Sequence, residues 1–167
     1  LFDSTVGLAL HEGSHIKLSN FDFLKNLENE IPTEYYKRAE VFGWSNYDVM
    51  SKVKDLLNYV EDRRIDYFVF TNSPGYKGYY HSLYDKYFHA KVIDKALTSD
   101  EYTSLDYDSY IFRIINLTNK NSDLSALPGL VDIRKVIFSN VKNLQSTEEA
   151  FSIALKVFDI ILNNIDV

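Results

Sequence analysis

The stretch SNYDVMSKVKDLLNYVEDRRI, residues 45–65, carries the clearest structural signal in this chain of 167 residues. Ser45, followed three residues later by Asp48, matches the capping box that opens many helices, with Asp in place of the usual Glu. Apolar residues then recur on one helical face, at Val49, Val53, Leu56, Leu57 and Val60. We therefore expect one long amphipathic helix from Ser45 to about Ile65.

Further helices are predicted on both sides of this one, at residues 5–18, 21–30, 33–41, 79–97, 109–117, 131–141 and 146–163. Tyr67–Phe70 is apolar and aromatic and could form a short strand. The expected fold is mainly α: a single helical domain over residues 1–167 with little or no sheet. Because the chain begins with Leu1 and not Met, we expect it to be a fragment of a longer protein.

Composition excludes several classes of function. A hydrophobic content of 46% argues against disorder, and a net charge of -6 argues against nucleic acid as a main partner. The absence of Cys excludes disulfides and thiolate metal sites. No apolar run approaches the ~20 residues that span a bilayer. The expected location is the cytoplasm, with no membrane partner.

The clearest functional signal is His11-Glu-Gly-Ser-His15, on the first predicted helix. Histidines at positions i and i+4 share one helical face, so both imidazoles can bind one metal ion. Catalytic zinc usually takes three protein ligands and leaves a fourth position open. The motif therefore predicts one Zn2+ per chain and requires a third ligand from elsewhere in the fold.

Several residues could supply that third ligand. Glu61 comes first, on the long helix, and the adjacent Asp62 is the alternative, since the two side chains point about 100° apart. Asp62 or Asp66 would otherwise accept the second N–H of a ligand imidazole. His81 and His89, eight residues apart on a predicted helix, are the remaining histidines.

With a metal in place, Glu12 would act as the general base and acid of a hydrolytic reaction. Negative charge on the attacked carbonyl group also needs a hydrogen-bond donor. The stretch Tyr76-Lys-Gly-Tyr-Tyr-His81 offers several such donors, and Tyr76 and His81 are the candidates we name. The structural interpretation of these aromatic residues is helix packing.

Each motif also has a purely structural interpretation. The His-Glu-x-x-His segment could be an exposed polar face. The polar run from Glu61 to Asp66 could be a solvated helix end. Gly13, in the middle of a predicted helix, costs roughly 1 kcal/mol against Ala, so we expect a reason for it, such as the close approach of a neighbouring backbone.

Two motifs, His11-Glu-Gly-Ser-His15 and the stretch with Leu56-Leu57-Asn58 and Glu61 to Asp66, resemble those of a known family. The family is the zincin-like metallopeptidase region found upstream of a von Willebrand factor A (VWA) domain in bacterial proteins. Such proteins are typically paired with MoxR-type AAA+ ATPases. The resemblance implies a gluzincin-type site with His11, His15 and Glu61 as ligands. It also implies a VWA-domain protein and a MoxR-type ATPase as partners.

Two hypotheses of function follow. The first is a zinc-dependent metallopeptidase, in which metal-activated water attacks a peptide bond of a peptide or protein substrate. The second is a metal-binding interaction domain without catalytic activity that docks an AAA+ ATPase or a client protein, in keeping with the 13 tyrosines of the chain. Solvent access to the metal would discriminate between them.

Overall fold

The structure, a computed structural model, describes residues 4–79, 82 and 91–167. All regular elements in these ranges are helices, which confirms the predicted mainly α fold. The α-helices and short 3-10 helices (η) are α1 (Ser4–Leu18), α2 (Phe21–Lys25), α3 (Leu27–Glu30), α4 (Thr33–Ala39), η1 (Glu40–Phe42), α5 (Asn46–Asn72), η2 (Pro74–Tyr76), α7 (Lys91–Thr98), α8 (Tyr107–Ile115), α9 (Leu130–Phe138), η3 (Val141–Asn143) and α10 (Thr147–Asn164).

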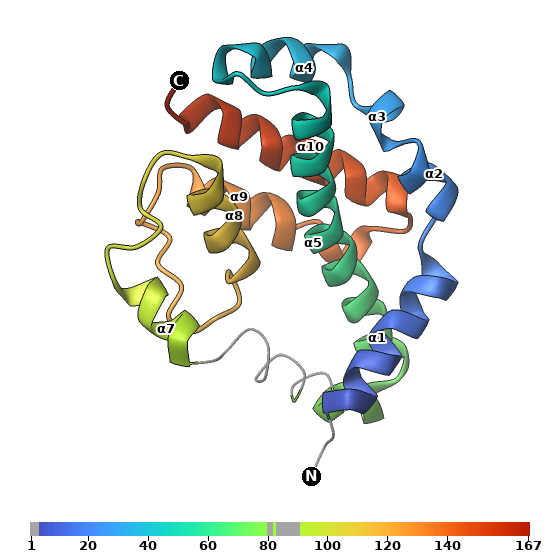
Figure 1. The fold of residues 1–167 in the computed structure, drawn as a ribbon. Helices are drawn as coiled ribbons and strands as arrows, with labels where there is room; N and C mark the ends of the chain where they lie inside the picture. Colours follow the sequence, from blue (N-terminus) through green and yellow to red (C-terminus); the bar gives the residue numbers. More distant parts are fainter. Residues whose placement is uncertain (1–3, 80–81, 83–90) are drawn as a thin grey trace.

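Helix α5 runs through the middle of the molecule, with elements from both ends of the chain packed around it (Figure 1). Its predicted capping box is confirmed: Ser45 Oγ accepts from the Asp48 amide, and the Asp48 carboxylate accepts from the Ser45 amide. The helix continues to Asn72, so the strand predicted at Tyr67–Phe70 is wrong. The apolar run contains no helix breaker, and Pro74 is the first residue that cannot continue the hydrogen-bond pattern.

The hydrophobic core lies mainly between α5 and α10, which cross in the middle of the molecule (Figure 1). Leu57 of α5 and Ala154, Val157 and Phe158 of α10 are fully buried there. Helices α8 and α9 pack against each other and extend the same core with residues such as Ile133. This apolar packing fixes the rotation of α5 about its own axis.

Helix α1 lies outside this core. None of its described residues belongs to the core, and Gly7 is its one buried residue. Its main contact is the lower half of α5 in Figure 1. Three of its apolar side chains remain exposed, namely Val6, Leu8 and Ile16.

The remaining helix predictions are confirmed apart from their ends, with two exceptions. The helix predicted at 21–30 is divided at Asn26 into α2 and α3, and the other exception is residues 79–97. There the structure describes α7 from Lys91 to Thr98, and residues 80, 81 and 83–90 lie outside the described part of the chain. Among the described residues, no helix has the length and apolar character needed to cross a membrane.

Candidate metal centre

Helices α1 and α5 each contribute a pair of side chains, one turn apart, to a single polar cluster. His11 and His15 come from α1, and Asp62 and Asp66 come from α5. Because i and i+4 residues share a helical face, each pair can meet the other when the two helices lie side by side. The His11 and His15 side chains are only 12% and 20% exposed, so the motif is not a solvated polar face.

Three atoms of this cluster form a small triangle. The Nε2 atoms of His11 and His15 are 3.1 Å apart, and Asp62 Oδ1 lies 3.2 Å from the first and 2.6 Å from the second. Ligand atoms bound to zinc at ~2.0–2.1 Å in tetrahedral geometry lie about 3.3 Å from one another. Two of the three distances match this value, and the shortest is that of a hydrogen bond. One divalent cation could therefore bind all three atoms.

The other nitrogen of each imidazole already has a partner. His11 Nδ1 lies 2.8 Å from Asp66 Oδ1, and His15 Nδ1 lies 3.1 Å from Ser19 Oγ. An ionised carboxylate only accepts hydrogen bonds, so Nδ1 of His11 carries a proton. Arg63 Nη2 in turn donates to Asp66 Oδ2 at 3.1 Å. Partners of this kind orient metal-binding histidines and leave Nε2 for the ion.

The electrostatics of the cluster favour positive charge. Burial by itself lowers the pKa of His11, but hydrogen bonds to Asp62 and Asp66 outweigh it and raise this pKa to about 10. Burial raises the pKa of Asp62, whereas its hydrogen bonds to His11 and His15 lower it to about 2. Asp62 is therefore an anion across the neutral range, and either a proton or a metal cation can compensate its charge.

The structure does not bring Glu61, the first choice for the third ligand, to the histidines. Its carboxylate accepts from Arg64 Nε at 2.5 Å and from the Thr147 hydroxyl. Glu61 is on the core side of α5 and only 2% exposed, about 100° around the helix from Asp62. Arg64 also donates to the Leu18 carbonyl at 2.9 Å. Together with Arg64, Glu61 thus connects α5 with α10 and with the end of α1. The carboxylate that lies beside the two histidines is that of Asp62.

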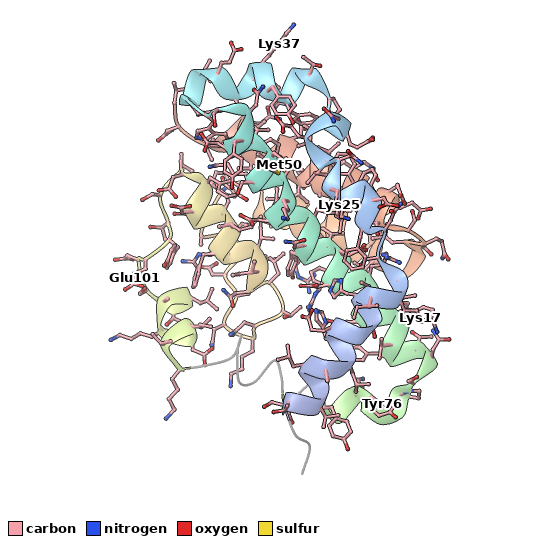
Figure 2. All side chains as sticks on the ribbon, turned by 45° about the vertical axis from the view of Figure 1, so that its right-hand side comes forward. Lys17, Lys25, Lys37, Met50, Tyr76 and Glu101 are labelled. Atoms are coloured by element: carbon pink, nitrogen blue, oxygen red, sulfur yellow. The ribbon has the colours of Figure 1, made fainter. Side chains whose placement is uncertain are left out.

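Glu12 and Tyr76, the other predicted site residues that the structure describes, are not part of the cluster. Glu12 is exposed and is not one of the grouped ligands. Tyr76 is 45% exposed beyond the end of α5, at the lower edge of the molecule in Figure 2. His81 and His89 lie outside the described residues. The close backbone approach expected at Gly13 is absent: nothing described lies within 4 Å of an added Cβ.

A cavity of about 300 Å³ opens beside the cluster, between α5 and α8. Asp62 forms part of its wall, together with Tyr59, Ile111 and Ile115. The Asp62 side chain is 33% exposed, more than either histidine. Among the three grouped residues, Asp62 is therefore the one that lies on the cavity wall.

Sequence reasoning missed the roles of Ser19 and Arg63. Ser19 lies four residues after His15, and the i,i+4 rule could have found it. The same rule pairs His11 with His15 and Asp62 with Asp66, each within its own helix, but it does not say which acidic residue faces the histidines. No sequence pattern predicts that residues of α8 line the cavity, because this depends on how α8 packs against α5.

Comparison with protein-family profiles, curated proteins and solved structures finds no match to this chain. The resemblance to the VWA-associated metallopeptidase region therefore stays a prediction.

Proposed function

We propose that this chain is a zinc-dependent hydrolase of peptide bonds, with one zinc ion held by His11, His15 and Asp62. The observation that carries the proposal is the triangle of two imidazole nitrogens and one carboxylate oxygen, with sides of 3.1, 3.2 and 2.6 Å. With the Nδ1 atoms partnered by Asp66 and Ser19, both Nε2 atoms face a common position. A cation bound there would take the place of the proton between the two nitrogens, and two imidazoles with one carboxylate match the ligand types of zinc.

The chemistry assigned to the side chains follows from their positions. A zinc ion would polarise the substrate carbonyl group and lower the pKa of a bound water toward ~7. Glu12, next to His11 on α1, would accept a proton as the water oxygen bonds to the carbonyl carbon. The same proton then goes to the leaving amine nitrogen as the C–N bond breaks. Glu12 is exposed, so its side chain is free to turn first toward the attacking water and then toward the leaving amine.

The open side of the cluster supports hydrolysis over a structural metal. Structural zinc sites have four protein ligands, whereas catalytic sites keep one position for water or substrate. Three ligand groups are gathered in the described residues, and the third of them lines a cavity of about 300 Å³. A substrate could therefore approach from the cavity between α5 and α8.

Zinc content of purified protein tests the metal site. We expect about one zinc per chain by mass spectrometry, with binding lost in His15→Ala and in Asp62→Ala. Asp55→Ala is the matched control, because Asp55 is exposed on the same helix and lines the same cavity. Glu61→Gln should also keep its zinc. Wild-type protein that takes up no zinc, or Asp62→Ala that binds it normally, would overturn the site.

Hydrolysis requires a separate test, because metal binding alone does not establish it. We expect zinc-loaded wild type to cleave internally quenched peptides, and Glu12→Gln to lose at least about 100-fold in rate at unchanged zinc content. Full activity in Glu12→Gln would refute the role of Glu12 as the base.

A second candidate function is a metal-binding interaction domain without catalytic activity. It is favoured by the position of α1, which lies outside the hydrophobic core with Val6, Leu8 and Ile16 exposed. A metal would then hold α1 in place and present this apolar surface. Zinc-dependent ordering of α1 without hydrolysis of any peptide would select this function. A VWA-domain protein and a MoxR-type ATPase as partners, and a cytoplasmic location, stay part of the proposal.

A further inference from the structure

Two cavities lie along one side of α5. Asp55, Tyr59 and Asp62 line the first, of about 300 Å³. Asp66, Tyr67 and Phe70 line the second, of about 200 Å³. Arg63 lines both. The two cavities therefore follow each other along α5 and meet near Arg63.

The two acidic residues that face the histidines each line one of the cavities. Asp62 lines the first cavity and Asp66 lines the second. His11 bridges these two carboxylates, with its Nε2 3.2 Å from Asp62 and its Nδ1 2.8 Å from Asp66. A ligand that reaches Asp62 from the first cavity therefore has the second cavity, lined by Asp66, one turn further along α5.

Both cavities have apolar walls. Ile111 and Ile115 of α8 line the first together with Tyr59. Phe138 and Val141 line the second together with Phe70. Burial of an apolar ligand side chain on such walls is favourable. Each cavity is at or below the lower end of the range for small-molecule sites, ~300–1,000 Å³, a size that suits a single side chain.

A buried polar group in the first cavity also indicates a ligand. Tyr59 is 8% exposed, and its hydroxyl is buried without a hydrogen-bond partner among the described residues. Buried hydroxyl groups nearly always have a partner. A backbone carbonyl group of a bound peptide would accept from this hydroxyl and supply the missing bond.

We infer that the substrate is an internal segment of a polypeptide, with an apolar side chain in each cavity and the scissile bond between them at the metal. This inference rests on the proposed function and makes the chain an endopeptidase. The span from position 55 to position 70 of α5 is about 22 Å. An extended peptide covers it with roughly six or seven residues.

Binding of a blocked hexapeptide tests the inference without turnover. The probe is acetyl-Phe-Ala-Ala-Ala-Leu-Ala-amide, titrated calorimetrically into zinc-loaded Glu12→Gln protein; in an extended peptide its Phe and Leu side chains share one face. We expect it to bind at least tenfold more tightly than acetyl-Phe-Ala-Ala-amide or acetyl-Ala-Leu-Ala-amide. Adding Ile115→Asp in the first cavity or Tyr67→Asp in the second should each weaken binding about tenfold.

Both of these positions are at least 36% exposed, so the substitutions spare the core. Val131→Asp is the matched control, since Val131 is 60% exposed on α9 and lines neither cavity. Half-peptides that bind as tightly as the hexapeptide, or a Tyr67→Asp variant that binds normally, would overturn the two-cavity arrangement.

Tyr59→Phe tests the buried hydroxyl group. Removal of one hydrogen bond to the ligand should weaken hexapeptide binding by about 3- to 10-fold, with no loss of thermal stability, since the hydroxyl has no protein partner in the described residues. Unchanged binding would refute this contact.

The outcomes separate this inference from the proposed function. If the wild type cleaves free peptides only at their terminal residues, the proposed hydrolase function stands and the inference of an internal substrate segment is overturned. If the hexapeptide binds tightly through both cavities but no peptide is cleaved, the two-cavity binding surface is supported and the proposed hydrolase function is overturned.

Discussion

Helix α5 is held from two sides by different physical means. On one side α10 packs against it with fully buried apolar residues such as Val157 and Phe158. On the other side α1 contributes no residue to the core, and its contact with α5 depends on His11 and His15 facing Asp62 and Asp66. Apolar packing responds to volume, whereas the polar contact responds to charge and to ions. The α10 side therefore determines the fold, and the α1 side can respond to a metal without loss of the fold.

The largest effect is expected on the apolar side. Phe158→Ala removes a fully buried ring of α10 that packs against Tyr35 and Trp44 in the core. The lost burial and the cavity left behind should lower the free energy of unfolding by about 3–5 kcal/mol. Thermal unfolding followed by circular dichroism measures the change. A loss below ~1 kcal/mol would show that the α5–α10 contact does not determine stability.

The next effect concerns Glu61, which connects the two sides. Glu61→Ala leaves Arg64, 6% exposed, without its carboxylate partner. An uncompensated buried charge costs about 3 kcal/mol or more. Urea unfolding should show the loss, and Glu61→Ala combined with Arg64→Met should recover part of it. If Glu61→Ala instead removed zinc and left stability unchanged, Glu61 would be a ligand and the assignment of Asp62 would fail.

Metal removal should act on the polar side alone. At a zinc concentration of 100 times its Kd, binding stabilises the bound state by about 2.7 kcal/mol. Chelation should therefore speed amide hydrogen exchange in α1, which has few apolar contacts, and leave exchange in α10 unchanged. Mass spectrometry of peptic fragments follows both helices in one experiment. Equal acceleration in α1 and α10 would show that the two sides are not independent.

Asp66→Asn tests the residue that orients His11. Its carboxylate accepts from His11 Nδ1 at 2.8 Å, and loss of such a partner typically weakens metal binding by about 10- to 100-fold. Competition with a zinc-binding dye gives the affinity. Asp55→Asn, on the same helix, is the control and should bind zinc normally. Equal affinities for both variants would remove Asp66 from the site.

The smallest effect is expected at Gly13. This residue is exposed in the interior of α1, and an added Cβ has free space around it. Gly13→Ala should stabilise α1 by about 0.5–1 kcal/mol through helix propensity. Slower hydrogen exchange in α1 at unchanged zinc content is the expected readout. A loss of zinc would show that the glycine has a role in the site.

The sequence predicted the helices well because their signals are local. The capping box at Ser45 and Asp48 and the apolar spacing through Val60 depend on residues within a few turns of one another. The end of α5 was the exception. The run from Tyr67 to Phe70 has strand composition, yet it continues the helix to Asn72, because no helix breaker interrupts it before Pro74.

The sequence by itself also determined which residue types could form a metal site: two histidines one turn apart and a group of acidic residues 46 or more positions later. Only the tertiary structure decided which acid faces the histidines. Packing of Leu57 and Val60 in the core turns Glu61, one turn after Leu57, toward the core as well. Asp62 points away from it, because it lies about 200° around the helix from Val60. That rotation is set by core packing between segments far apart in the chain, and no local pattern around residue 61 encodes it.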